Sequence, residues 1–356
     1  GTERPLDSWL GIDDASVSRG ARQLCTLAAM AGGSFAKGTE VLWRLGQLRV
    51  SDEQLRTLAE AEGRRVKDDL EEGRVGPDWT AADCRTPEGV SRITVGADGV
   101  MVPVITAAEK AKRRAKRRRR KARRRPLAQR LFKGSEHPWK EFKIAGFYDP
   151  PKERVWAFGT AGGPNVIGRR MRRAAGRLRI GEASERVAVT DGAEWIRGQL
   201  QTRLPMVEVR ILDYFHLMEH IGEAAVIGFG AGRPETMAWI EAASKAALEE
   251  GVAGLLVKIR ETVRPVRSSA KREAFKKLEQ YVANHAEMLD YPRYRAAGFD
   301  IGSGPTESLC RTLTARLKGG GKRWNTPNAE ALMALAALKH SRLWQNYWAT
   351  QLRKAG

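Results

Sequence analysis

The chain has 356 residues, and its 63 lysines and arginines outnumber its 42 aspartates and glutamates, which gives a formal net charge of +21 at pH 7. Apolar residues make up 42% of the chain, enough to bury a core, so wholesale disorder and a fibrous protein are excluded. The length predicts two or three domains. Such an excess of positive charge indicates a polyanion as the partner.

The three cysteines are far apart and form no CxxC pair, so neither a disulfide framework nor a cysteine-based zinc site is indicated. No window approaches the roughly 20 apolar residues of a membrane span. The first residues, TERPLDSWLG, lack a signal-peptide pattern. We therefore expect a cytoplasmic, nucleoid-associated protein with no membrane partner.

The positive charge is unevenly distributed. Residues 1–90 contain 12 basic and 16 acidic residues, whereas residues 91–125 contain 14 basic and 2 acidic ones. Thirteen of the sixteen residues from Lys110 to Arg125 are cationic and the others are alanines, so this segment has no apolar face to bury. It is either a solvated, self-repelling loop or a phosphate-binding arm that becomes helical up to Pro126 once phosphates neutralise it.

The first 75 residues are predicted to be helical. Val41, Leu42 and Leu45 have helical spacing, and after Gly46 and an N-cap at Ser51 a second helix presents Leu55, Leu58 and Ala59. Two helices joined by a short turn have the outline of a helix-turn-helix, and plain helical packing is the alternative.

Residues 92–212 are predicted to form a mixed α/β sheet. Strands are expected in RITVGADGVMVPVI, in the hairpin formed by KEFKIAGFYD and RVWAFGT, in RVAVT and in MVEVRIL. An arginine-rich helix over 167–180, which contains no acidic partner, and a helix over 191–204 separate the later strands. Residues 214–291 are predicted to be almost entirely helical, followed by helices from Pro305 and from Pro327.

Three acids stand at the ends of these elements: Asp98, Asp191 and Glu307. Each has a structural alternative. Asp98 before Gly99 fits a bulge or turn, Asp191 with Glu194 fits a capping box, and Glu307 would be the third helical residue if Gly304 is the cap.

The joint placement of these acids is harder to explain structurally. If the first and fourth strands are neighbours, Asp98 and Asp191 come together, and a helix across that edge adds Glu307. Three carboxylates suffice for two Mg²⁺ ions roughly 4 Å apart, which clamp an in-line phosphoryl displacement.

A second constellation is DYFHLMEH, in which Asp213, His216 and His220 share one helical face. Paired histidines at this spacing are found in zinc sites, but the glutamate of HExxH is missing, so zinc is a minor option. The alternative is a helix cap at Asp213 with histidines at an interface.

Taken together, DG at Asp98, TDGAEW at Asp191, DYFHLMEH and GSGPTES at Glu307 resemble the RNase H-like DDE transposases of bacterial insertion sequences, most closely the Kra-type family in the group similar to Mutator transposases. The resemblance covers about residues 91–345. It implies a metal triad of Asp98, Asp191 and Glu307 that binds two Mg²⁺ ions, with Mn²⁺ able to substitute.

In related enzymes an Asp- or Cys-x-x-His motif follows the fifth strand. Asp213 and His216 match it, which implies that they support the scissile phosphate, and His216 is also expected to be catalytic. His220, on the same helical face, is expected to support the active site with them.

The resemblance also implies a domain division. We expect a helical N-terminal domain over 1–90, an RNase H-like core over 91–213 with a basic arm over 107–130, an all-helical insertion domain over 214–300, and the rest of the core over 301–356. The 116 residues between Asp191 and Glu307 leave room for that insertion. The basic arm is longer and more cationic than we would expect of the family.

The predicted activity is transposition: metal-dependent cleavage of double-stranded DNA at the terminal inverted repeats of the element, then transfer of the 3′ ends into target DNA. Cutting two ends requires coordination, so a homodimer or larger assembly is expected. The alternatives are an inactive or domesticated DNA-binding relative and a general nuclease of the same fold.

The residues expected to contact DNA are Arg113, Arg117, Arg118, Arg119, Arg120, Arg169, Arg170, Arg172, Arg173, Lys318, Lys322, Arg323 and Trp324. The tryptophan either stacks on a base or packs in the core.

Overall fold

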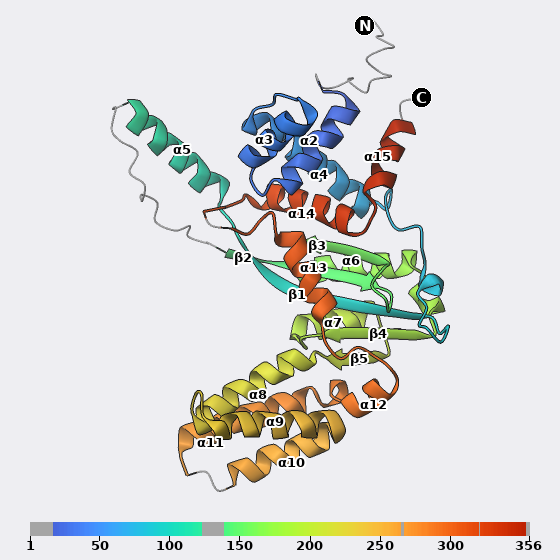
Figure 1. The fold of residues 1–356 in the computed structure, drawn as a ribbon, viewed down its shortest axis with the longest axis vertical. Helices are drawn as coiled ribbons and strands as arrows, with labels where there is room; N and C mark the ends of the chain where they lie inside the picture. The colour runs from blue at the N-terminus through green and yellow to red at the C-terminus, as the bar shows by residue number, and fades with distance from the viewer. Residues whose placement is uncertain (1–16, 123–138, 265–266, 320, 354–356) are drawn as a thin grey trace, which may run out of the picture.

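A computed structural model gives the structure of residues 17–122, 139–264, 267–319 and 321–353. Its centre is a five-stranded mixed sheet with the strand order β3-β2-β1-β4-β5 (Figure 1). β1 pairs with β2 in the antiparallel sense and with β4 in the parallel sense, so the condition for Asp98 and Asp191 to meet, that the first and fourth strands are neighbours, is fulfilled. The strands are β1 (Arg92–Pro103), β2 (Trp139–Tyr148), β3 (Val155–Thr160), β4 (Glu185–Thr190) and β5 (Val209–Leu212).

β1 runs without interruption through Asp98 and Gly99, which pair with Ile144 and Lys143 of β2. The alternative of a turn at Asp98 is therefore wrong. A long strand is favoured here because alternate residues on both faces are covered, and Ile93, Val95, Val100 and Val102 are all buried. Asp98 thus lies inside a regular strand, where its backbone position is fixed by neighbours on both sides.

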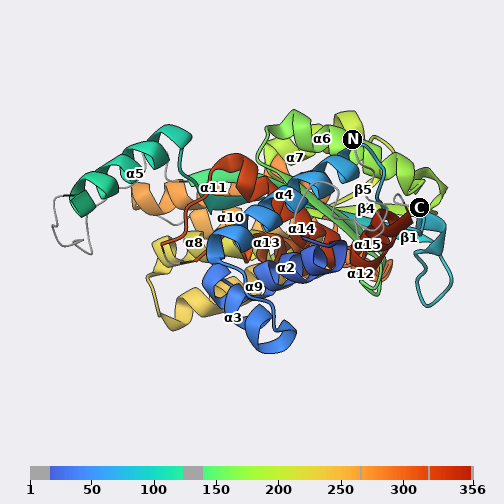
Figure 2. The same ribbon diagram turned by 90° about the horizontal axis from the view of Figure 1, so that it is seen from above.

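Helices cover both faces of the sheet (Figure 2). α6 and α7 lie on one face, and α13 and α14 lie on the other with the N-terminal helices. These helices are α6 (Pro164–Arg177), α7 (Glu194–Arg203), α13 (Gly304–Thr314), α14 (Thr326–His340) and α15 (Trp344–Arg353). Three short 3₁₀ turns complete the chain path: η1 (Ala81–Asp83), η2 (Ile180–Glu182) and η3 (Ala286–Met288).

The N-terminal helices are α2 (Arg19–Ala31), α3 (Phe35–Gly46) and α4 (Asp52–Glu71). Leu42, Leu55 and Ala59 are buried as predicted. Leu45 is 84% exposed, so α3 buries a narrower face than the spacing of its apolar residues suggests. α4 packs so closely on α14 that a Cβ at Gly63 would lie 2.4 Å from the carbonyl oxygen of Ala331. This burial favours the packing alternative, and the helix-turn-helix stays a prediction.

The described residues of 214–300 form a helical segment with its own hydrophobic core, which also includes side chains of β4 and β5. It lies beside β5, at the edge of the sheet far from β3 (Figure 1). Tyr291 and Tyr294 anchor it by donating hydrogen bonds to the carbonyl oxygens of Leu212 (3.0 Å) and Arg210 (3.2 Å). Its helices are α8 (Tyr214–Phe229), α9 (Pro234–Glu249), α10 (Gly251–Val263), α11 (Ser269–Asn284) and α12 (Tyr291–Ala296).

No helix in the described ranges is long and apolar enough to cross a membrane.

Candidate active site

Asp98 and Asp191 are brought together by the pairing of β1 with β4. Ala97 of β1 is the register partner of Thr190, the last residue of β4. Asp98 and Asp191 are the next residue of each chain segment, and the two strands run in the same direction. Neighbouring strands lie about 4.8 Å apart, so the backbones of Asp98 and Asp191 lie side by side.

Asp98 is half-buried and receives two hydrogen bonds. The amide of Gly99 donates to Oδ1 (2.5 Å), and the thiol of Cys310 donates to Oδ2 (3.5 Å). Burial raises the pKa of the Asp98 carboxyl, and the negative charges of Asp191 and Glu307 raise it further. Because the charges of both other carboxylates act on Asp98, the three predicted acids share one electrostatic environment.

Glu307 lies on α13. This helix packs very closely against β1 and β2. A Cβ at Gly96 would lie 1.9 Å from Oγ1 of Thr306, and one at Gly146 would lie 2.5 Å from Cδ1 of Leu309. Glu307 precedes Cys310 by three residues, so the two side chains are neighbours on the surface of α13, and Cys310 is the one that contacts Asp98. The N-cap of α13 is Ser303, which makes Glu307 the fourth helical residue instead of the third. Its carboxylate is exposed and has no hydrogen bond or ion pair within the described residues.

Asp191 lies in the short loop between β4 and α7. Its Oδ1 accepts a hydrogen bond from the amide of Ala193 (2.9 Å). The predicted capping box with Glu194 is absent, because α7 begins at Glu194 itself with Ala193 as its N-cap and no side-chain cap. The loop turns at Gly192, whose φ of +77° favours glycine.

Asp213 has a structural role. It is 4% exposed and caps α8, with Oδ1 accepting from the amides of Phe215 and Ser303 (3.1 Å each). Its Oδ2 accepts from the Ser303 hydroxyl at 2.7 Å. The helix-cap alternative is thus confirmed for Asp213. The same carboxylate fixes the start of α13, and through it the position of Glu307.

His216 and His220 are adjacent on α8, with ring centroids 5.0 Å apart. Nδ1 of His216 lies 3.2 Å from a carboxylate oxygen of Glu219. His220 stacks on Tyr281 of α11, with centroids 4.0 Å apart. Burial lowers the pKa of His220, and the nearby charge of His216 lowers it further. The two histidines therefore belong to an aromatic cluster between α8 and α11.

Across the described residues, no group of three or more histidine, cysteine, aspartate or glutamate side chains is arranged closely enough to hold a metal ion. This applies both to the three carboxylates and to the histidine pair. What the three carboxylates offer is a donor set of hard oxygens with mutual repulsion at Asp98, which suits Mg²⁺ or Mn²⁺. The histidines lack a third ligand, which argues against zinc.

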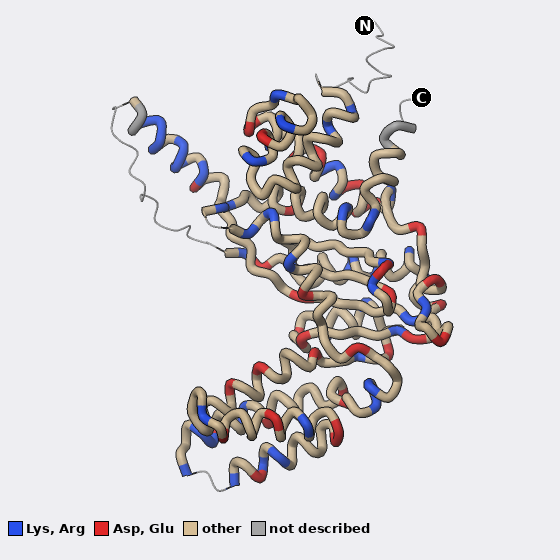
Figure 3. The backbone as a smooth tube through the Cα atoms, in the orientation of Figure 1, with Lys and Arg blue, Asp and Glu red and all other residues tan. Residues whose placement is uncertain are grey.

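The basic arm begins as a helix. α5 (Ala107–Ala122) starts with a reciprocal pair of hydrogen bonds between Thr106 and Glu109, a capping box. It projects from the body of the protein, with its lysines and arginines along its length (Figure 3). Arg117, Arg118 and Arg119 are exposed, Arg113 is half-buried, and Arg120 lies near the end of α5. The rest of the predicted arm, 123–130, lies outside the described residues.

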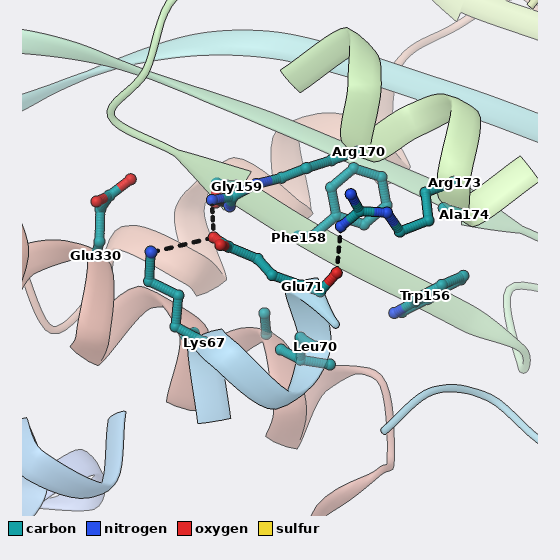
Figure 4. A pocket seen from close by; sticks show the side chains of 12 residues that line it. Lys67, Leu70, Glu71, Trp156, Phe158, Gly159, Arg170, Arg173, Ala174 and Glu330 are labelled. Atoms are coloured by element: carbon teal, nitrogen blue, oxygen red, sulfur yellow. Dashed lines mark hydrogen bonds and ion pairs between the residues drawn. The ribbon is translucent and has the colours of Figure 1, made fainter. Parts of the chain in front are cut away.

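Two of the arginines predicted to contact DNA hold the N-terminal helices instead (Figure 4). Arg170 of α6 pairs with the Glu71 carboxylate and donates to the carbonyl of Gly159, and Arg173 donates to the carbonyl of Glu71. These contacts border a cavity of about 50 Å³ at the β3 edge of the sheet, away from the carboxylates. The helix contains no acidic residue of its own, and the acidic partner of Arg170 comes from α4. Arg169 and Arg172 are exposed.

The loop after α13 also differs from expectation. Trp324 is 9% exposed, donates to the carbonyl of Leu317 (3.0 Å) and packs edge-on against Phe35, so the base-stacking prediction is wrong and the core alternative is confirmed. Lys322 donates to the carbonyls of Arg316 (3.4 Å) and Lys318 (3.2 Å), which ties its ammonium to the segment that follows α13. Lys318 is exposed and Arg323 is half-buried.

Three contacts near the site were not predicted. The Cys310 thiol at Asp98 could have been suspected, because Cys310 stands one helical turn after Glu307. His285 and Tyr281 of the helical segment lie against the Asp191 loop and the histidine pair, and nothing in their local sequence indicates it.

The chain matches no protein-family model and no curated protein. Among solved structures it is similar to the Drosophila P element transposase strand transfer complex, with a TM-score of 0.33 and 11% sequence identity over 95% of this chain and 82% of that chain. A similarity this low does not establish a family or a function. Membership of the Kra-type family therefore stays a prediction, and the function has to be inferred from the site itself.

Proposed function

We propose that this chain is a DNA transposase with an RNase H-like core. It would cleave DNA at the ends of its own element and join the released 3′ ends to target DNA. The observation that carries the proposal is the pairing of Ala97 with Thr190, which sets Asp98 beside Asp191 on adjacent parallel strands. The charge of Glu307 on α13 acts on the same carboxyl group. Asp98, Asp191 and Glu307 are the proposed catalytic residues.

Two of these carboxylates accept hydrogen bonds within the protein, and the third, that of Glu307, is exposed. Asp98 is held by Gly99 and Cys310, and Asp191 by the amide of Ala193, so neither has to be ordered when substrate binds. The exposed Glu307 completes the site from α13. To hold two Mg²⁺ ions, or Mn²⁺ in their place, these three side chains would have to come closer together than they lie in the described residues. When bound, such ions activate a water nucleophile and stabilise the leaving oxygen of a phosphodiester.

His216 is proposed to orient the substrate phosphate. Its side chain remains 34% exposed, whereas the buried Asp213 uses its oxygens within the protein. Asp213 acts indirectly, by fixing the beginning of the helix that carries Glu307. His220 supports His216 through the ring contact between them.

The proposed DNA contacts are revised by the structure. The exposed side chains Arg117, Arg118, Arg119, Arg169, Arg172 and Lys318 remain candidates for binding the phosphate backbone, together with Arg113, Arg120 and Arg323. Arg170, Arg173, Lys322 and Trp324 are occupied within the protein. A homodimer or larger assembly that pairs two element ends is part of the proposal.

The test is cleavage of three DNA substrates by the purified protein with Mg²⁺ or Mn²⁺: the terminal inverted repeats of its element, scrambled repeats, and unrelated duplex. The proposal predicts strand cleavage confined to the repeats, and none with the Asp191→Asn variant. Equal cutting of all three substrates would identify a general nuclease. Tight binding of the repeats without any cleavage would identify an inactive DNA-binding relative.

A further inference from the structure

Two contacts join the Asp191 loop and the helix after it to the helical segment 214–300, one from each. Nε2 of His285 lies 3.2 Å from the carbonyl oxygen of Gly192, the residue after Asp191. On the other side of the loop, Arg197 of α7 donates to the carbonyl of Asn284 at 2.9 Å. His285 and Asn284 are consecutive residues at the end of α11. One point of the helical segment therefore holds both the Asp191 loop and the helix that follows it.

The backbone conformation of Gly192 and its lack of a side chain allow the His285 ring to approach. With a φ of +77°, it adopts a conformation that residues with a side chain rarely take. A Cβ placed there would lie 2.7 Å from Cδ2 of His285 and 2.7 Å from Cδ1 of Leu212. The His285 ring fills the space that a side chain at 192 would need. The glycine of the Asp191-Gly192 pair thus serves the docking of a residue that lies 93 positions away in sequence.

The orientation of His285 is fixed by a stack of rings. Tyr281 lies between His285, with centroids 4.4 Å apart, and His220 of α8, with centroids 4.0 Å apart. Nδ1 of His285 also lies 2.8 Å from the carbonyl of Tyr281. The Tyr281 hydroxyl is buried and has no hydrogen-bond partner within the described residues. Tyr281 therefore contacts His285 and His220 through its ring. Burial raises the pKa of this phenol, and the charges of Asp191 and Asp213 raise it further, so it stays neutral beside the carboxylates.

We infer that His285 and Tyr281 are positioning residues for Asp191, through which the helical segment sets the geometry of the active site. The inference rests on the proposed function. Neither residue is placed on the substrate. His285 holds the Gly192 carbonyl and so the direction of the Asp191 side chain, and Tyr281 holds the His285 ring between two helices.

The inference is tested with four variants in the full chain. His285→Ala removes the contact to Gly192, and His285→Gln keeps an N–H donor. Tyr281→Leu removes the stack, and Tyr281→Phe keeps it. His340→Ala, at the end of α14, is the matched control for losing a half-buried histidine. Each protein is compared by cleavage of element ends, by calorimetric titration with Mn²⁺, by DNA affinity and by melting temperature.

We expect His285→Ala and Tyr281→Leu to lose about 10- to 100-fold in cleavage rate and in Mn²⁺ affinity, as is typical of residues that orient a metal ligand. DNA affinity should stay within about twofold, because the DNA surface is elsewhere. His285→Gln, Tyr281→Phe and His340→Ala should stay near the unaltered protein. Unchanged cleavage and Mn²⁺ affinity in His285→Ala would overturn the inference, as would equal losses in His285→Gln. If the unaltered protein cleaves nothing, the proposed function fails, and the Mn²⁺ titration alone then decides the role of His285.

Discussion

The thiol of Cys310 on α13 lies 3.5 Å from Oδ2 of Asp98 on β1, although the two residues are 212 positions apart. α13 therefore contacts the central strand through a hydrogen bond as well as through packing. Burial raises the pKa of this thiol, and the charge of Asp98 raises it further. Cys310 thus remains protonated and donates to Asp98 throughout the neutral range.

This hydrogen bond predicts a change in pH dependence. It favours the charged form of Asp98, so Cys310→Ala should raise the pKa of Asp98 further above its ordinary value. Because cleavage requires the carboxylate, the acidic limb of the pH profile of kcat/KM should move to higher pH. Cys84→Ala, which removes another buried cysteine, is the control and should leave the limb in place. An unshifted limb in Cys310→Ala would contradict the role of the thiol.

The close approach of α13 to β1 predicts a steric effect at Gly96. Gly96→Ala places a Cβ 1.9 Å from Oγ1 of Thr306, so it should lower the free energy of unfolding by about 1–3 kcal/mol and slow cleavage by displacing Glu307. Gly96→Ala combined with Thr306→Ala should recover part of both losses.

Urea denaturation measures the stability change. The control is Gly176→Ala in α6, where a Cβ meets nothing within 4 Å, and which should stabilise the protein by about 0.5–1 kcal/mol. Equal stability of the Gly96 and Gly176 variants would rule out the close contact.

The sheet could be predicted largely from the sequence, because strand patterns are local. The alternation of apolar residues around Asp98 and the run RVAVT predicted β1 and β4, whereas their adjacency was only a condition for Asp98 and Asp191 to meet. The turn at Asp98 was wrong because the Asp-Gly pair is a turn signal only when the strands on either side pair with each other, and here both halves pair with β2.

The partners of individual side chains could not be predicted. Arg170 looks unpaired within its own helix, and only the fold brings Glu71 to it, from 99 positions earlier in the chain. The sequence left Trp324 either on a base or in the core, and Asp213 either at phosphate or in a helix cap, and burial selects the core and the cap. Long-range contacts of this kind depend on tertiary packing, which leaves no local pattern.

The shared cap of α8 and α13 predicts coupling between Asp213 and Ser303. Asp213→Ala leaves the buried Ser303 hydroxyl and two amides without their acceptor, so it should cost about 2–4 kcal/mol of stability. Ser303→Ala removes only the hydroxyl that donates to Asp213, so it should cost less, about 1 kcal/mol. In a double-mutant cycle the two changes should couple by about 0.5–3 kcal/mol. Additive effects would show that the two side chains do not act together.

The two groups of arginines should respond differently to neutralisation. Replacing Arg117, Arg118 and Arg119 of α5 by glutamine should weaken DNA binding and reduce the slope of log Kd against log salt by about 0.9 for each phosphate that the arm no longer neutralises. Arg170→Gln breaks the pair with Glu71, so it should lower the melting temperature with little change in that slope. Fluorescence anisotropy at several salt concentrations separates the two cases. A larger slope change in Arg170→Gln than in the α5 variant would reverse the assignment.

The central claim is that Asp98, Asp191 and Glu307 act as one catalytic unit, and the most direct measurement is single-turnover cleavage of element ends by Asp98→Asn, Asp191→Asn, Glu307→Gln and the triple variant. Residues that act together are strongly non-additive. Each single variant should therefore lose about 10³-fold or more in rate, with DNA affinity retained, and the triple variant should lose little beyond that. A single variant that keeps about a tenth of the unaltered rate, or losses that multiply in the triple variant, would contradict a shared catalytic site.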